Sequence, residues 1–180
     1  MKLLRAALIV LLLGSSSASA ASFYFGVRLD VPIAWETVGQ TTNTIVLPML
    51  GVQAGLDFDS ASSGTGIRFT LSSQVISGAR FAGDIYVRSP ILPELSAYLG
   101  GGGTMMIETR TRLLYFNVHI LGGLEYQVSP GIGLFAEVSP GFALGFGPNA
   151  CIGAPPLDTS TCGSLVPFTL ESAIGLNFRF

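Results

Sequence analysis

Apolar and polar residues alternate along most of this chain, and that spacing limits the possible folds more than any other feature. Between residues 167 and 180, every second residue belongs to a mainly apolar set. That set is Phe168, Leu170, Ser172, Ile174, Leu176, Phe178 and Phe180. The residues between them carry all the charges of the segment. A helix would repeat its apolar residues at spacings of three and four, whereas a strand points successive residues to opposite faces. The segment is therefore predicted to be a β-strand with one apolar face.

The same two-residue period recurs in seven earlier segments. The eight predicted strands are 23–33, 45–58, 66–76, 81–89, 95–107, 113–127, 132–146 and 167–180. The weakest of these is 95–107, because four consecutive glycines at 100–103 blur its alternation. Turn-forming residues stand between strands at 59–66, 89–94 and 129–131. An all-β fold is therefore expected.

The first twenty residues have the three-part layout of a secretory signal peptide. Lys2 and Arg5 precede an apolar run at 6–13, and Ala18-Ser19-Ala20 forms a small-x-small cleavage site. The run is far shorter than the roughly 20 apolar residues that a transmembrane helix needs. The expected organisation is a signal peptide at 1–20 followed by one domain at 21–180.

The scarcity of charge indicates where the apolar faces of the strands point. A soluble sandwich or barrel hides its apolar face, whereas a membrane barrel turns that face to lipid and lines its interior with polar residues. Charged residues make up 11% of the chain, against about 25% in soluble domains. Sixteen strands of about 9–11 residues would leave nothing for the connections. The sequence favours an eight-stranded antiparallel up-and-down transmembrane β-barrel over residues 21–180.

Three features make the sequence resemble the small eight-stranded outer-membrane β-barrel proteins of the OmpA/OmpW-like kind. They are the signal peptide, the run GGLEYQVSPGIGLFAEVSPG and the ending GLNFRF. The resemblance implies a place in the bacterial outer membrane, among its lipids. It also implies that the barrel-assembly machinery recognises an assembly signal formed by Ile174, Leu176, Phe178 and Phe180. The chain departs from the OmpA type, because no periplasmic domain follows the barrel.

The alternation places a large set of ionisable residues on the inward, polar face. The set is Arg28, Asp30, Asp57, Arg68, Asp84, Arg88, His119, Glu125, Glu137, Glu171 and Arg179. Its charged members should form ion pairs, because an unpaired buried charge is costly. The interior of an eight-stranded barrel is just wide enough for side chains to fill it. A structural ion-pair plug is therefore favoured over an ion or substrate pathway.

His119, the only histidine of the chain, raises the alternative of a lipid-modifying barrel enzyme with an imidazole base and a serine nucleophile. The lipid A deacylase barrels have His and Ser close in sequence, whereas Ile120, Leu121 and Gly122 follow here. A histidine in a polar interior is more often a hydrogen-bonding residue. We therefore expect no catalytic residues, no metal site and no cofactor.

Cys151 and Cys162 both lie in the predicted connection 147–166. An exported protein meets an oxidising space, so a disulfide between them is expected. By the resemblance, the N-terminus is periplasmic and this connection faces outside, as does the connection 34–44. The stiffened connection could bind an extracellular ligand or resist proteolysis, and both readings stay open.

The function expected from the sequence is that of an integral outer-membrane barrel, either structural or a small-molecule conduit with a largely plugged lumen. The alternative from another class is an exported soluble, lipocalin-like binding barrel, which would line its cup with apolar residues. A nucleic-acid partner is not expected. Lys and Arg total 9 against 11 Asp and Glu, and no basic patch exists to neutralise phosphates.

Overall fold

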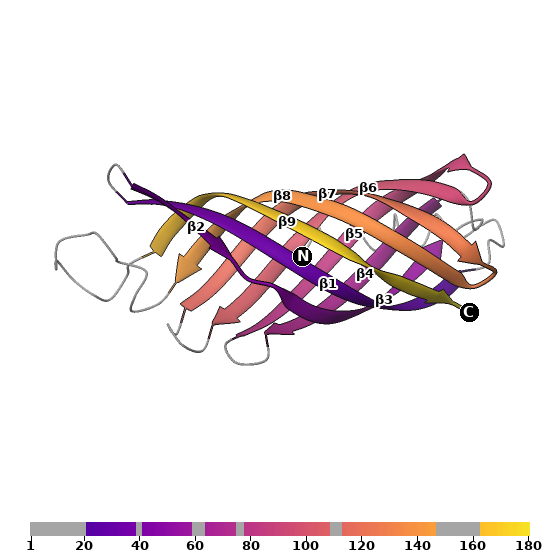
Figure 1. The fold of residues 1–180 in the computed structure, drawn as a ribbon, viewed down its shortest axis with the longest axis horizontal. Coiled ribbons are helices and arrows are strands. Elements are labelled where there is room, and N and C mark those ends of the chain that lie inside the picture. Colours follow the sequence, from indigo (N-terminus) through magenta and orange to yellow (C-terminus); the bar gives the residue numbers. More distant parts are fainter. Residues whose placement is uncertain (1–20, 39–40, 59–63, 75–77, 109–112, 147–162) are drawn as a thin grey trace, which may run out of the picture.

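The computed structural model describes residues 21–38, 41–58, 64–74, 78–108, 113–146 and 163–180, which form one closed antiparallel β-barrel (Figure 1). Its strands are β1 Ser22–Val38, β2 Thr41–Val46, β3 Met49–Phe58, β4 Gly64–Gln74, β5 Gly78–Leu92, β6 Leu95–Glu108, β7 Leu113–Ser129, β8 Ile132–Phe146 and β9 Gly163–Arg179. Within those ranges, no helix is long and apolar enough to cross a membrane.

The nine strand elements make eight barrel strands, because β2 and β3 are two parts of one strand. Both pair with β1 in one register, as Ile33 with Val46 and Asp30 with Met49 show. The break falls at Pro48, which has no N–H to donate to the ladder. The N–H of Leu47 still donates to the carbonyl of Pro32 at 3.1 Å. Pairing of β1 with β9 closes the ring, and the predicted eight-stranded barrel is confirmed.

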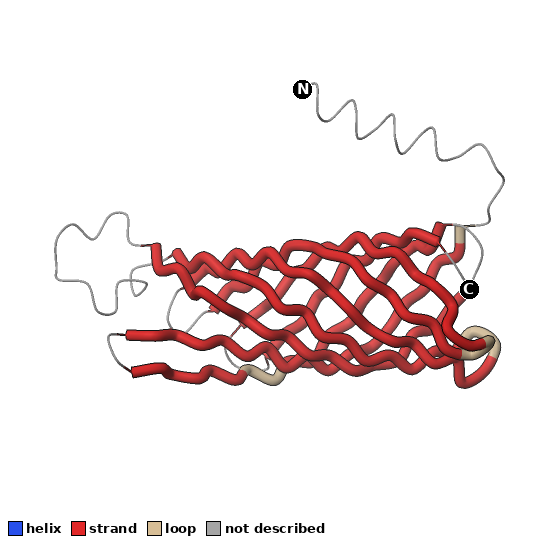
Figure 2. Tube along the Cα trace, turned by 90° about the horizontal axis from the view of Figure 1, so that it is seen from above, coloured by secondary structure: helices blue, strands red, loops and turns tan. Residues whose placement is uncertain are grey.

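The strands are staggered around the barrel. A path of paired residues runs from Tyr24 through Gly55, Arg68, Asp84, Gly102, His119, Gly141 and Thr169 to Ala34. One circuit therefore returns to β1 ten residues further along the strand. Such a stagger tilts the strands against the barrel axis, as Figure 2 shows. With eight strands, the interior is filled by side chains.

Side chains alternate between the outside and the interior along every barrel strand. Large apolar residues are exposed on the outside, Val118 by 73% and Phe69 by 65%. The interior is polar, and Asp30 within it has no exposed surface. This distribution reverses that of a soluble barrel and is the distribution of a transmembrane barrel, whose apolar face meets lipid.

The two ends of the barrel differ in their connections. One end, here called the terminal end, carries Ser22, Phe180 and the tight turns at 93–94 and 130–131. In the second turn Gly131 has a φ of 87°, a left-handed conformation that glycine adopts without strain. The other end, here called the far end, is where β1, β4, β6 and β8 stop.

Several predicted boundaries are wrong. β5 begins at Gly78 rather than at residue 81, and it continues through Pro90 to Leu92, so the turn is shorter than the predicted 89–94. The strand tolerates Pro90 because the pairing register shifts there. The predicted connection 34–44 is mostly strand, since β1 runs to Val38 and β2 starts at Thr41. The glycine-rich segment 95–107 is a full strand, β6.

Candidate functional site

The eleven ionisable residues singled out from the sequence lie in the barrel interior. Ten of them are buried, and the side chain of Arg179 is 16% exposed at the terminal end. They come from β1, β3, β4, β5, β7, β8 and β9. The structure therefore brings together, in one narrow space, residues that are more than 140 positions apart in the sequence.

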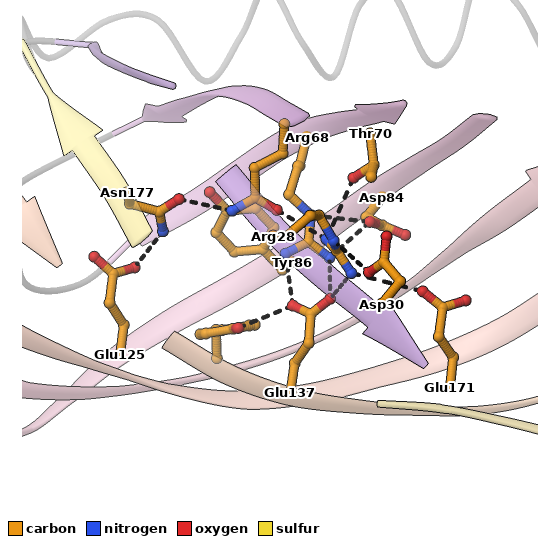
Figure 3. Close-up of polar contacts among 12 residues, drawn as sticks. Arg28, Asp30, Arg68, Thr70, Asp84, Tyr86, Glu125, Glu137, Glu171 and Asn177 are labelled. Carbon is orange, nitrogen blue, oxygen red and sulfur yellow. Dashed lines mark hydrogen bonds and ion pairs between the residues drawn. The ribbon is translucent and has the colours of Figure 1, made fainter. Parts of the chain in front are cut away.

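Glu137 joins two arginines in the middle of this interior (Figure 3). Its carboxylate lies 2.6 Å from Arg28 Nη2 and 2.7 Å from Arg68 Nη1. Each arginine also binds a second carboxylate: Arg28 pairs with Asp30 at 2.5 Å, and Arg68 with Asp84 at 2.8 Å. The planar guanidinium suits this role, because its fork of N–H groups can serve two carboxylates at once.

Two ion pairs cross the full width of the lumen. Arg68 on β4 meets Glu137 on β8 at 2.7 Å, and these strands are four apart in the eight-strand ring. Arg80 on β5 meets Glu171 on β9 at 2.5 Å, again four strands apart. Side chains from opposite walls therefore touch at two levels of the barrel.

A separate cluster fills the terminal end. Arg179 pairs with Glu125 at 2.8 Å and with Asp57. Arg88 lies 3.4 Å from each of the same two carboxylates. The hydroxyl of Tyr86 donates to Asp57 at 2.5 Å. Two arginines thus balance two acids here.

Arg80 is a buried charged residue that lies outside the strands predicted from the sequence. It is buried, pairs with Glu171 at 2.5 Å and lies 3.8 Å from Asp30. Arg80 is an even number of residues from Asp84 and Arg88, so the alternation along the strand places all three on the inward face. The predicted strand began one residue too late to include it.

Neutral polar residues of the interior were also missed, and they complete the network. Tyr98 donates its hydroxyl to Glu137 at 2.9 Å. Gln53 accepts from Arg28 at 2.8 Å and donates to Asn177 at 2.6 Å. Each of these residues is an even number of positions from an inward-facing charged residue on its strand or lies on the same face, so the alternation also predicts that they point into the lumen.

Glycines on intervening strands let several of these partners meet. In four cases the two bonded side chains sit on strands separated by one more strand, whose residue at that level is glycine. The pairs are Gln53–Asn177 across Gly26, Asp57–Tyr86 across Gly66, Asp84–His119 across Gly102, and Tyr98–Glu137 across Gly123. A Cβ on any of these glycines would collide with a partner side chain. The small residues of the inward face therefore make room for the network.

Little empty space remains around the terminal cluster. A hollow lined by Tyr24, Arg68, Tyr86, Arg88, Tyr98, Glu125, Asn177 and Arg179 leaves about 10 Å³ for the centre of a water molecule. That is room for about one water. Within the described residues, no group of three or more His, Cys, Asp or Glu side chains is arranged to hold a metal ion.

Other predicted sites lie on the outer face or outside the described residues. Ile174, Leu176 and Phe180 are exposed on the outside, Phe178 is half-buried, and Phe180 stacks on Phe23 with ring centres 6.4 Å apart. Their recognition by the barrel-assembly machinery stays a prediction. Cys151, Cys162 and the signal peptide at 1–20 lie outside the described residues, as does most of the connection 147–166.

No family model matches the sequence, and no curated protein does. A de novo designed transmembrane β-barrel has a TM-score of 0.49 and 12% identity, over 88% of this chain and 95% of the design. Neisserial surface protein A has a TM-score of 0.48 and 10% identity, over 89% and 99%. The attachment invasion locus protein Ail of Yersinia pestis has a TM-score of 0.46 and 12% identity, over 90% and 99%.

Proposed function

We propose that this chain is an integral outer-membrane barrel protein with a structural role, whose lumen is closed by its ion-pair network. The crossing pairs Arg68–Glu137 and Arg80–Glu171 carry this proposal, at 2.7 Å and 2.5 Å. A solute would have to separate both pairs in order to pass. Separating a buried pair leaves uncompensated charges in a poorly hydrated space, which is strongly unfavourable.

The outer face supports membrane insertion. Val118 and Phe69 are more than half exposed, as are Ile85, Leu99 and Ile120. An apolar surface that encircles a barrel in this way fits hydrocarbon and would associate non-specifically in water. The OmpA/OmpW-like type, export through residues 1–20 and a disulfide between Cys151 and Cys162 belong to the same proposal.

The second candidate is a small-molecule conduit through the same lumen. Conductance across a planar lipid bilayer separates the two functions. The structural proposal predicts no steady current from the inserted, folded barrel. A steady single-channel current that scales with salt concentration would replace it with the conduit.

The two remaining alternatives receive less support. A lipocalin-like binder would line its cup with apolar residues, whereas this interior holds buried arginines and carboxylates. A lipid-modifying enzyme would need a hydroxyl nucleophile bonded to the base. Among the described residues, His119 bonds to Asp84 through Nε2, and its Nδ1 has no hydrogen-bond partner. Extraction from membranes by detergent, but not by salt or alkaline carbonate, is the expected behaviour of the native protein.

A further inference from the structure

Outward-facing aromatic residues recur near both ends of three barrel strands. They are Phe23 and Trp35 on β1, Phe116 and Tyr126 on β7, and Phe168 and Phe178 on β9. The two members of each pair are ten or twelve residues apart, and residues an even number apart on a strand lie on the same face. The outer face of these strands therefore carries two aromatic positions with a nearly constant separation.

Pairing and ring contacts arrange these residues in two rows. At the far end, Trp35 pairs with Phe168 and the ring centres are 5.5 Å apart. Phe142 on β8 meets Phe168 at 6.4 Å. At the terminal end, Phe23 stacks on Phe180 at 6.4 Å. We call Trp35, Phe116, Phe142 and Phe168 the far row, and Phe23, Tyr126, Phe178 and Phe180 the terminal row.

The separation of the two rows agrees with the thickness of a bilayer. A strand rises about 3.3 Å per residue, so the ten to twelve residues between rows span about 33–40 Å along a strand. Barrel strands tilt by about 35–45°, which reduces this span to about 23–33 Å along the barrel axis. The apolar band of a transmembrane barrel is about 25 Å tall, and the hydrocarbon core of a bilayer is about 30 Å thick. The rows are therefore as far apart as the two interfaces of one membrane.

The amphipathic rings of the outer face lie in these rows. Trp35 is the only tryptophan of the chain. Of the five tyrosines, all of which the structure describes, Tyr126 faces outward and is 51% exposed. The other four lie on the inward side of their strands, namely Tyr24, Tyr86, Tyr98 and Tyr115. Rings with a polar edge prefer the membrane–water interface to hydrocarbon, so Trp35 and Tyr126 each indicate one boundary.

The chain becomes polar directly beyond the far row. β1 and β2 continue there as a hairpin that projects past the end of β4 (Figure 1). Between Glu36 and Thr44, the sequence has one apolar side chain, Val38. Thr44 pairs with Trp35 and is exposed. The apolar outer surface of β1 thus ends at Trp35.

We propose that the far row and the terminal row mark the two membrane–water interfaces, and that the hairpin of β1 and β2 beyond Trp35 stands in water. The partner of both rows is the headgroup region of a lipid bilayer, whose mixed polarity suits rings with a polar edge. The inference rests on the proposed function and adds to it the depth at which the barrel sits.

The native tryptophan can report its own depth in phosphatidylcholine vesicles. Lipids brominated close to the headgroup quench shallow indoles, and lipids brominated near the chain ends quench deep ones. The ratio of shallow to deep quenching should exceed one for Trp35. Ile120→Trp in a Trp35→Phe background is the matched control, because Ile120 is 63% exposed and lies between Phe116 and Tyr126 on β7. Its ratio should fall below one.

The terminal row is tested by Tyr126→Trp in the same Trp35→Phe background. Tyr126 lies on the outer face, six residues from Ile120 on the same strand. Its replacement therefore leaves the lumen network in place. The ratio of shallow to deep quenching should again exceed one.

The possible results separate the position of the boundaries from membrane insertion itself. A ratio at or below one for Trp35 or for Tyr126→Trp would overturn the assignment of that row. So would the absence of quenching there while Ile120→Trp is quenched, or a ratio for Ile120→Trp as high as that of Trp35. Each of these results would leave the membrane barrel intact. Absence of quenching at all three positions would instead contradict the proposed function.

Discussion

His119 Nε2 lies 2.8 Å from Asp84 Oδ1, although β7 and β5 are not neighbours in the barrel. β6 runs between them, and its residue at this level is Gly102, which pairs with both. The contact exists because Gly102 has no side chain to separate the imidazole from the carboxylate. The absence of a Cβ atom on β6 thus permits a bond between side chains of β5 and β7.

Replacement of Gly102 tests this relationship. In Gly102→Ala, the new Cβ would collide with Asp84 Oδ1 and with the carbonyl of Gly83. The free energy of unfolding, measured by urea titration in lipid vesicles, should fall by about 1–3 kcal/mol, the usual range for overpacking. Gly103→Ala is the control, because its Cβ points outside and lies 3.7 Å from the nearest atom. Equal losses in the two variants would show that the space at Gly102 is not needed.

The crossing pair of Arg80 and Glu171 should show strong coupling. Arg80→Met leaves Glu171 with Arg28 as its nearest cation, at 3.6 Å, and should cost about 3–5 kcal/mol of unfolding free energy. Adding Glu171→Leu removes the uncompensated charge, so the double variant should regain most of that loss. A double variant whose loss equals the sum of the two single losses would mean that the residues do not act as a pair.

Tyr98 should contribute through its hydroxyl, which donates to Glu137 at 2.9 Å in a buried setting. Tyr98→Phe removes that donor and should lower the free energy of unfolding by about 1.5–3 kcal/mol, as for hydrogen bonds to charged groups. Tyr126→Phe supplies the comparison, because Tyr126 is 51% exposed on the outer face. If both variants unfold at the same urea concentration as the parent, the Tyr98 bond adds nothing to stability.

The alternation of the sequence predicts the number of strands and the side on which each residue lies. Glu137 and Val138 differ by one position, and parity alone separates the interior from the outside. It does not predict which charges meet, because partners such as Arg68 and Glu137 depend on the ten-residue stagger of the closed ring. That stagger is fixed by pairing along every ladder, and no local segment encodes it.

The predicted ends of the strands also differ from the structure, and one of these differences changes which residues belong to the lumen network. The predicted strand starts at residue 81 and therefore excludes Arg80, whereas β5 begins at Gly78. Neither Gly78 nor Ala79 carries a strong strand signal, and pairing with β6 holds them in the ladder. Tertiary pairing thus extends strands beyond their local preference.

Tryptophan fluorescence can test directly whether the apolar face of the barrel meets hydrocarbon while the charged face is enclosed. Phe69 and Phe135 form a matched pair for this test, since Phe69 is 65% exposed outside and Phe135 is 1% exposed inside. Each would be replaced by tryptophan in a Trp35→Phe background, and its fluorescence measured in vesicles of lipids with brominated acyl chains. Strong quenching of Phe69→Trp with little quenching of Phe135→Trp is the predicted result. Stronger quenching at position 135 than at position 69 would contradict the account.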